Sequence, residues 1–181
     1  MPRRPRILID EGYYHLLTRG NDKKIIFRNP QDYSYFLGII GNYLPQFRIG
    51  LVHYCLMDNH IHLIVRAYKA EDLPKFMQRI LQVYAHYFRR NYDAVGFLFQ
   101  NRYKSYLLEN IRYLLECGRY IERNPLRAGV VRTLEEYVWS SYAYYARGQK
   151  NTLITAADPL YTELGPSVQE RQKQYRDFLL Q

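Results

Sequence analysis

The sequence predicts an α+β fold in which helices pack on a ferredoxin-like antiparallel sheet, followed by a C-terminal helical extension. Strand-like and helix-like segments alternate in the order β, α, β, β, α, β, α over residues 13–122, which fits an antiparallel or mixed sheet with helices on one or both faces. A short polar turn separates the two middle strands, as expected for sheet neighbours. At 181 residues and 48% hydrophobic composition, the chain is long enough to bury one substantial core.

The first predicted elements are a strand and a helix. Residues 13–18 are typical of a short strand, which ends in a turn cluster at residues 19–22. Asn29-Pro30 opens a helix that runs to about Tyr43, and Pro45 closes it. The apolar residues at helical spacing are Tyr33, Phe36, Leu37, Ile40 and Tyr43.

Two strands and the clearest helix follow. Residues 48–57 are mostly apolar, β-branched or aromatic and predict a strand; residues 58–59 predict a turn or bulge, and residues 60–66 continue as a strand. Residues 73–92 predict a helix, because their apolar side chains form one stripe. The stripe consists of Leu73, Phe76, Met77, Ile80, Leu81, Tyr84 and Phe88.

The last third of the chain predicts one strand and several helices. Gly96 ends the long helix, and residues 97–108 predict a loop that feeds a strand. A second strong helix begins at about Asn110, its expected N-cap, and stops before Pro125. Residues 133–147 predict a short helical segment around Trp139, and residues 165–180 a final helix. We therefore expect a domain over residues 1–147 and an extension, residues 148–181, that docks on it.

The charge balance points to a polyanionic partner. Lys and Arg outnumber Asp and Glu by 26 to 17, a net charge of +9, and the pI is near 9.5. Nucleic acid is therefore expected ahead of an acidic membrane surface. The 20 tyrosines interleave with cations, a pattern that fits stacking on unpaired bases, although most of them are expected to be half-buried packing residues.

The remaining gross features indicate a reduced, cytoplasmic protein. Cys55 and Cys117 form no CxxC pair, so we expect neither a disulfide framework nor a thiolate zinc site. No apolar run approaches the roughly 20 residues that span a bilayer. The start M-P-R-R-P-R lacks the apolar core of a signal peptide.

Two histidines interrupt an apolar strand. Side chains alternate along a strand, so His60 and His62 share a face about 7 Å apart, while Ile61 and Leu63 face the helices. We expect the histidines on the open face of the sheet. They are either half-exposed strand residues or two ligands of one metal ion, which would need a third oxygen or nitrogen ligand from elsewhere.

The second strong helix offers that ligand and a nucleophile. Tyr120 and Asn124 are four residues apart and share a helix face. A phenolate from Tyr120 that attacked phosphorus would form a covalent phosphotyrosine, helped by a metal or by Arg119 or Arg123, while Asn124 offers a carbonyl oxygen. Tyr120 could equally pack on the sheet, as Tyr113 could.

At these residues the sequence resembles a known family, the HUH single-strand transposases of the IS200/IS605 type with one catalytic tyrosine, and in particular the REP-associated tyrosine transposases. Four segments carry the resemblance in the family's order: residues 57–63 (M-D-N-H-I-H-L), 96–105 (with Q-N-R-Y-K-S), 120–129 (Y-I-E-R-N-P-L-R-A-G) and 139–142 (W-S-S-Y). The resemblance implies a ferredoxin-like fold. It further implies that His60 and His62 are metal ligands and Tyr120 the nucleophile, and that Asn124, where many members have Gln, is a third ligand.

The implied reaction cleaves single-stranded DNA to a 5′-phosphotyrosine and a free 3′-OH, then rejoins it. The implied cofactor is a divalent metal, Mg²⁺ or Mn²⁺, and two imidazoles favour Mn²⁺. The implied substrate carries imperfect, REP-like hairpins. Candidate DNA contacts, each of which could also be only a solvated charge, are Arg3, Arg4, Arg6, Lys75, Arg79, Arg89, Arg90, Arg102 and Lys104.

The resemblance leaves the assembly and two rival functions open. A homodimer with the site shared between chains and a monomer with the site in one chain are both known arrangements of the family. The extension after Arg147 resembles the tail of the REP-associated members, which can be monomeric, and this resemblance favours the monomer. One rival function is a hairpin-binding regulatory module of the same fold without strand transfer. The other is an unrelated metal phosphodiesterase that activates water, which would need more carboxylates near the histidines than Asp58.

Overall fold

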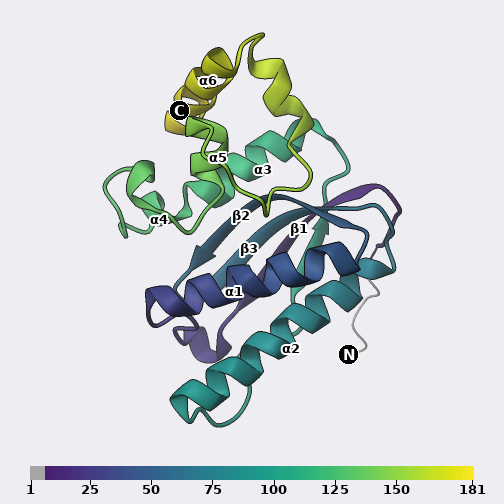
Figure 1. The fold of residues 1–181 in the computed structure, drawn as a ribbon, viewed down its shortest axis with the longest axis vertical. Coiled ribbons are helices and arrows are strands. Elements are labelled where there is room, and N and C mark those ends of the chain that lie inside the picture. Colours follow the sequence, from purple (N-terminus) through teal and green to yellow (C-terminus); the bar gives the residue numbers. More distant parts are fainter. Residues whose placement is uncertain (1–6) are drawn as a thin grey trace.

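The predicted sheet and its topology are confirmed. The computed structural model describes residues 7–181. Four antiparallel strands form one sheet in the order β2-β3-β1-β4, the ferredoxin-like arrangement (Figure 1). The strands are β1 (Gly12–Arg19), β2 (Ile49–Met57), β3 (His60–Ala67) and β4 (Lys104–Leu107), and the helices are α1 (Pro30–Tyr43), α2 (Asp72–Tyr92), α3 (Arg112–Glu122), α4 (Asn124–Arg127), α5 (Tyr142–Arg147) and α6 (Val168–Leu180).

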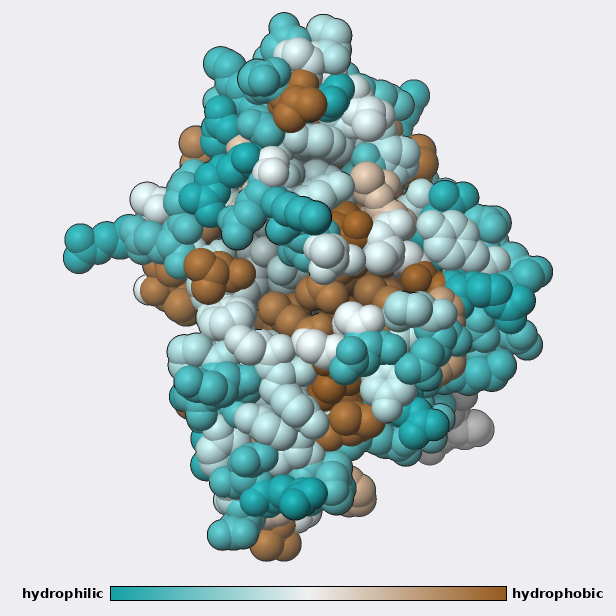
Figure 2. Space-filling model, viewed as in Figure 1, coloured by the Kyte–Doolittle hydropathy of each residue, from teal (hydrophilic) through white to brown (hydrophobic). Residues whose placement is uncertain are grey.

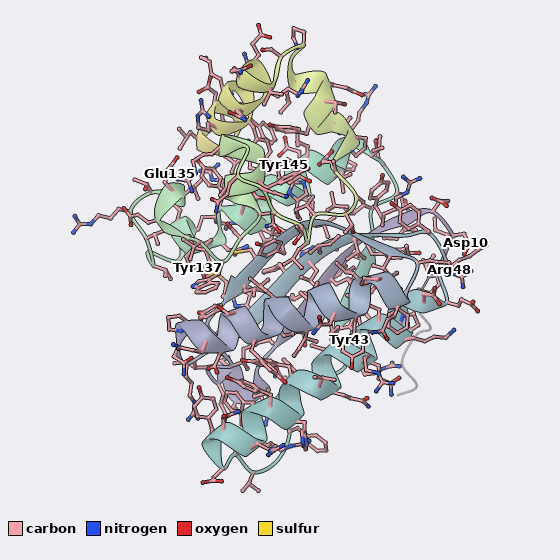
Figure 3. All side chains as sticks on the ribbon, in the orientation of Figure 1. Asp10, Tyr43, Arg48, Glu135, Tyr137 and Tyr145 are labelled. Atoms are coloured by element: carbon pink, nitrogen blue, oxygen red, sulfur yellow. The ribbon has the colours of Figure 1, made fainter. Side chains whose placement is uncertain are left out.

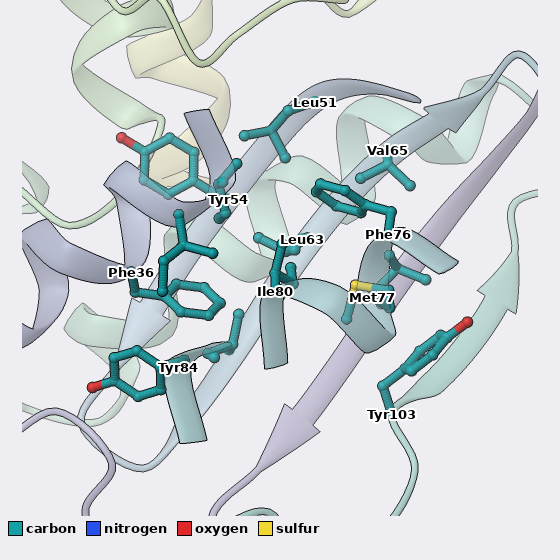
Figure 4. Close-up of a cluster of buried hydrophobic side chains, with 14 of the residues drawn as sticks. Phe36, Leu51, Tyr54, Leu63, Val65, Phe76, Met77, Ile80, Tyr84 and Tyr103 are labelled. Carbon is teal, nitrogen blue, oxygen red and sulfur yellow. The ribbon is translucent and has the colours of Figure 1, made fainter. Parts of the chain in front are cut away.

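Helices cover both faces of the sheet. Helices α1 and α2 lie together on one face, and α3 to α6 gather on the other (Figure 1). The main core lies under α1 and α2, where side chains such as Leu63 of β3 pack with Phe36, Phe76 and Ile80 (Figure 4). Figure 2 shows hydrophobic side chains across the middle of the molecule, between the two helical layers, and hydrophilic ones over much of the outer surface.

The second face is the one on which the sequence places the histidines, and it is not open. Val52, Cys55 and Ile64 of the sheet are buried against Leu114 and Ile121 of α3. The expectation of an open face is therefore wrong, because the helix after β4 folds back over the sheet and uses its own apolar stripe to cover these strands. The histidines lie beneath and beside a helix.

The C-terminal residues attach to this second layer. Tyr175 and Leu179 of α6 are buried with Leu115 of α3 and Tyr145 of α5. Tyr145 also donates a hydrogen bond from its hydroxyl to the Val52 carbonyl of β2, 2.8 Å away (Figure 3). A capping box of Ser167 and Glu170 starts α6.

Two local predictions need correction. The helix expected from Asn110 begins at Arg112; the Asn110 side chain accepts a hydrogen bond from the Arg112 backbone N–H at 2.9 Å but stands before the helix. Trp139 is not helical: it lies between the 3-10 helix Leu134–Glu136 and α5. Its carbonyl accepts a hydrogen bond from the Leu56 N–H at 2.9 Å, so this segment pairs with β2 instead.

Candidate active site

The strand register brings three histidines together on the second sheet face. His60 lies opposite Arg19 and His62 opposite Leu17, both on β1, and directly opposed residues share a face. His15 is two residues from Leu17 and therefore lies on the same face. The ring centroids of His60 and His62 are 5.0 Å apart, and those of His15 and His62 are 5.1 Å apart.

The two predicted ligands are neutral imidazoles with defined partners. Nδ1 of His60 is 2.7 Å from Oδ1 of Asn59; because a carboxamide oxygen only accepts, Nδ1 carries the proton and Nε2 keeps its lone pair. Burial, together with the Arg19 charge, lowers the pKa of His60 to about 4. Burial, with the neighbouring histidines and Arg19, lowers the pKa of His62 to about 2.

The third histidine was not among the predicted site residues. Nε2 of His15 is 2.8 Å from Nδ1 of His62, and burial lowers the pKa of His15 to about 4. The sequence signal was the alternation of β1, which places His15 on a defined face. Its neighbour across the sheet depends on register, which the alternation does not specify.

Helix α3 carries Tyr120 to the histidines of the same chain. The apolar stripe of α3 is buried, and Tyr120 lies at its edge, 46% exposed. The Tyr120 ring centroid is 6.1 Å from that of His62 and 6.4 Å from that of His15. Arg127 of α4 places its guanidinium carbon 5.3 Å from the Tyr120 ring centroid, so a positive charge accompanies the phenol.

Asn124 is the first residue of α4, directly after α3 ends. Its Nδ2 donates hydrogen bonds to the carbonyls of Tyr120 and Ile121, at 3.1 and 3.2 Å. The carboxamide therefore donates to two carbonyls in the last turn of α3. Both bonds use the amide nitrogen, and metal binding requires the oxygen, so capping and the predicted ligand role use different atoms.

The donor chemistry of the histidine pair fits a divalent ion. Both imidazoles are neutral, the form that binds metal, and two of them leave positions for a third donor and for substrate oxygens. Within residues 7–181, no group of three or more His, Cys, Asp or Glu side chains is placed to hold a metal. An additional donor would therefore be an amide, a phenol, water or the substrate.

The predicted DNA contacts fall into separate groups. Arg102 and Lys104 line one depression together with Arg19, the residue opposite His60. Arg89 lines a groove between α2 and residues 97–103. Arg3, Arg4 and Arg6 lie outside the described residues.

The other predicted cations belong to α2, which lies across the sheet from α3, the helix that carries Tyr120 (Figure 1). Lys75 is 3.7 Å from the Asp72 carboxylate. The Arg79 guanidinium lies 5.9 Å from the Tyr43 ring centroid. Like Lys75 and Arg79, Arg90 belongs to α2, so the structure does not bring these three to the tyrosine.

Instead Arg119, Arg123 and Arg127 line a depression with Tyr120.

A buried polar network holds α3 on the sheet. Nδ1 of His53 is 3.0 Å from Glu122 Oε1, and Nε2 is 3.1 Å from Asp158 Oδ2; the three side chains are buried. Burial disfavours the His53 imidazolium, but the hydrogen bonds to the two carboxylates outweigh it and raise the pKa of His53 to about 9. Ser141 and Tyr175 also donate to Glu122. Residues of β2, α3 and the extension thus meet in one network, which the sequence analysis did not find.

Comparison with known protein families assigns this fold to a class of DNA-acting proteins, the transposases. The family described as "Transposase IS200 like" matches residues 9–124, which is more than half of the chain. The chain belongs to this family of transposases. No helix in the described part of the chain is long and apolar enough to cross a membrane.

A solved structure shares the fold at low sequence identity. A REP-associated tyrosine transposase bound to a REP hairpin is similar over 87% of this chain and 92% of its own, with a TM-score of 0.70 and 18% identity. A putative transposase from Deinococcus radiodurans R1 covers 67% of this chain and 97% of its own, with a TM-score of 0.47 and 16% identity. No match was found among curated proteins.

Proposed function

We propose that the chain cleaves and rejoins single-stranded DNA that carries imperfect hairpins, through a 5′-phosphotyrosine on Tyr120 and with a divalent metal. Membership of the transposase family supports DNA strand cleavage. The similarity in fold to a REP-associated tyrosine transposase bound to a REP hairpin supports the substrate and the REP-associated branch. In this proposal His60 and His62 hold the ion, Mg²⁺ or Mn²⁺, and Asn124 contributes its carbonyl oxygen.

One observation carries the proposal: Tyr120 stands over the histidines of its own chain. The ring centroids of Tyr120 and His62 are 6.1 Å apart, so one phosphodiester can contact both the phenol and the imidazoles. Tyr113, on the same helix, is 63% exposed. Tyr106 of β4, whose ring centroid is 5.9 Å from that of His15, is the nearer rival.

The chemistry follows from those positions. The Tyr120 oxygen attacks phosphorus, the bond to the 3′-oxygen breaks, and the proton lost by the phenol is balanced by one gained at the 3′-OH. The Arg127 guanidinium, beside the Tyr120 ring, supplies positive charge near the phosphate that the tyrosine attacks. A bound divalent ion would polarise a non-bridging phosphate oxygen. Because the phosphotyrosine conserves the ester, rejoining is the reverse attack by a 3′-OH and needs no nucleotide cofactor.

The same geometry supports a monomer with the site in cis. Glu122 of α3 is hydrogen-bonded to Tyr175 of the extension at 2.9 Å and lies 3.0 Å from His53 of the sheet. Removing α3 from its own sheet would leave these buried groups without partners, which is costly. These contacts all form within one chain, so a complete site in a monomer needs no rearrangement of α3.

The test is a covalent-adduct assay with labelled single-stranded hairpin DNA and Mn²⁺, read on a denaturing gel. We expect an adduct with the unaltered chain and none with Tyr120→Phe or His62→Ala. The matched controls, Tyr113→Phe and Tyr106→Phe, should keep it. An adduct that survives in Tyr120→Phe would refute the assignment of the nucleophile.

The rival functions give different results in the same assay. Hydrolysed DNA without an adduct would indicate a water-activating phosphodiesterase. Tight hairpin binding without cleavage would indicate a regulatory module. Either result would overturn the proposed reaction.

A further inference from the structure

His15 contacts His62, and the proposed reaction assigns His15 no role. His62 is 4% exposed, and its Nδ1 is occupied by Nε2 of His15 at 2.8 Å. The two rings are nearly parallel, at an interplanar angle of 20°. Of the two ring nitrogens of His62, Nε2 is therefore the one left to bind an ion.

Only one arrangement of the protons permits that binding. A neutral imidazole carries one N–H, so one of the two facing nitrogens donates and the other accepts. If Nε2 of His15 donated, Nδ1 of His62 would accept, and the single proton of His62 would sit on Nε2 and block it. If Nδ1 of His62 donates, Nε2 of His62 presents a lone pair.

We propose that His15 is the positioning residue of the metal site: its Nε2 accepts the Nδ1–H of His62 and so holds His62 in the tautomer whose Nε2 is free. This inference rests on the proposed ligand role of His62. Asn59 has the corresponding relation to His60 through its carboxamide oxygen. Each predicted ligand thus has its own acceptor, and such partners fix ring orientation and strengthen metal binding.

The direct test reads the tautomer without metal or DNA. Long-range ¹H–¹⁵N spectra of the metal-free protein, at a pH where the three imidazoles are neutral, separate protonated from bare ring nitrogens. We expect His62 to be protonated at Nδ1 and bare at Nε2, with His15 bare at Nε2. The opposite pattern at His62 would overturn the proposal, whether or not the protein cleaves DNA.

Mn²⁺ affinity, measured by the electron paramagnetic resonance signal of free Mn²⁺, supplies a second readout. His15→Phe keeps a stacked ring but has no acceptor, and we expect it to bind Mn²⁺ about 10- to 100-fold more weakly. His15→Gln offers an acceptor oxygen and should recover part of the affinity. Tyr106→Phe, which alters a neighbouring ring of His15, should bind normally.

Two outcomes of the affinity measurement would contradict the proposal. Unchanged Mn²⁺ affinity in folded His15→Phe would show that the acceptor is dispensable. His15 would be a metal ligand and not a positioning residue if His15→Phe and His15→Gln lost Mn²⁺ affinity equally and Mn²⁺ acted directly on the Nε2 signal of His15. If His15→Phe fails to fold, the spectra of the unaltered protein and the His15→Gln affinity decide the matter.

Discussion

Gly118 tests whether close packing of α3 on the sheet positions Tyr120. A Cβ atom at Gly118 would lie 2.8 Å from both Cε1 and Nε2 of His53 and 3.1 Å from Cδ2. Normal carbon contacts are about 3.5–4.0 Å, so Gly118→Ala requires helix and ring to separate by at least about 0.7 Å. His53 cannot readily yield, because both its ring nitrogens are held by buried carboxylates.

The expected cost follows from two opposing effects. Overpacking of a rigid contact costs about 1–3 kcal/mol. Because the His53 ring is held in place, we expect a cost at the upper end of this range, about 3 kcal/mol. Alanine is preferred over glycine in a helix by about 1 kcal/mol. We therefore expect a net loss of about 2 kcal/mol in the free energy of unfolding, and a Tm lower by about 4–8 °C.

Urea denaturation of Gly118→Ala beside Gly38→Ala measures this effect. Gly38 is exposed on α1 and a Cβ there meets no atom within 4 Å, so this control should gain about 0.5–1 kcal/mol. Gly118→Ala should also form the Tyr120 adduct more slowly, since Tyr120 is two residues away. If Gly118→Ala were as stable as Gly38→Ala, the close approach of α3 to His53 would be refuted.

Four further predictions concern pH, a buried carboxylate, DNA and metal. The pKa of His53 is about 9 in the folded state and about 6.5 in the unfolded state. Stability on the order of 3 kcal/mol should therefore be present below pH 6.5 and be lost between about pH 6.5 and 9. Denaturation of His53→Gln across that range should show no such loss. Asp32→Ala should cost about 3 kcal/mol in urea denaturation, since the buried carboxylate accepts from Arg28 N–H, Tyr87 and Tyr92; a loss below about 1 kcal/mol would contradict this. Lys104→Ala should weaken hairpin binding and reduce its salt slope by about 1, whereas an unchanged slope would exclude a phosphate contact. Chelation with EDTA should abolish the adduct and Mn²⁺ should restore it, and an adduct formed in EDTA would exclude metal dependence.

Local pattern was sufficient to predict most of the fold. The alternation of residues 60–63 predicted which side chains face α1 and α2, and Ile61 and Leu63 do lie in that core. The expectation that Tyr120 lies near His62, 58 residues earlier in the chain, came from the family resemblance. The family resemblance, and not periodicity, distinguished Tyr120 from the other tyrosines.

The features that escaped prediction depend on register and on long-range contacts. His15 reaches His62 only because β1 pairs with β3 in a register that puts Leu17 opposite His62. The contacts of Glu122 to His53 and of His53 to Asp158 join residues 69 and 105 positions apart. No local periodicity predicts such contacts. The strand pattern alone also could not show that α3 covers the sheet face that carries the histidines.

The most direct measurement is the site of the covalent adduct. Trypsin would cut the chain into residues 105–112, 113–119 and 120–123, which separate Tyr106, Tyr113 and Tyr120. After the hairpin DNA has been trapped with Mn²⁺ and trimmed by nuclease, mass spectrometry should find the nucleotide on residues 120–123. A nucleotide on residues 105–112 or 113–119 would contradict the account.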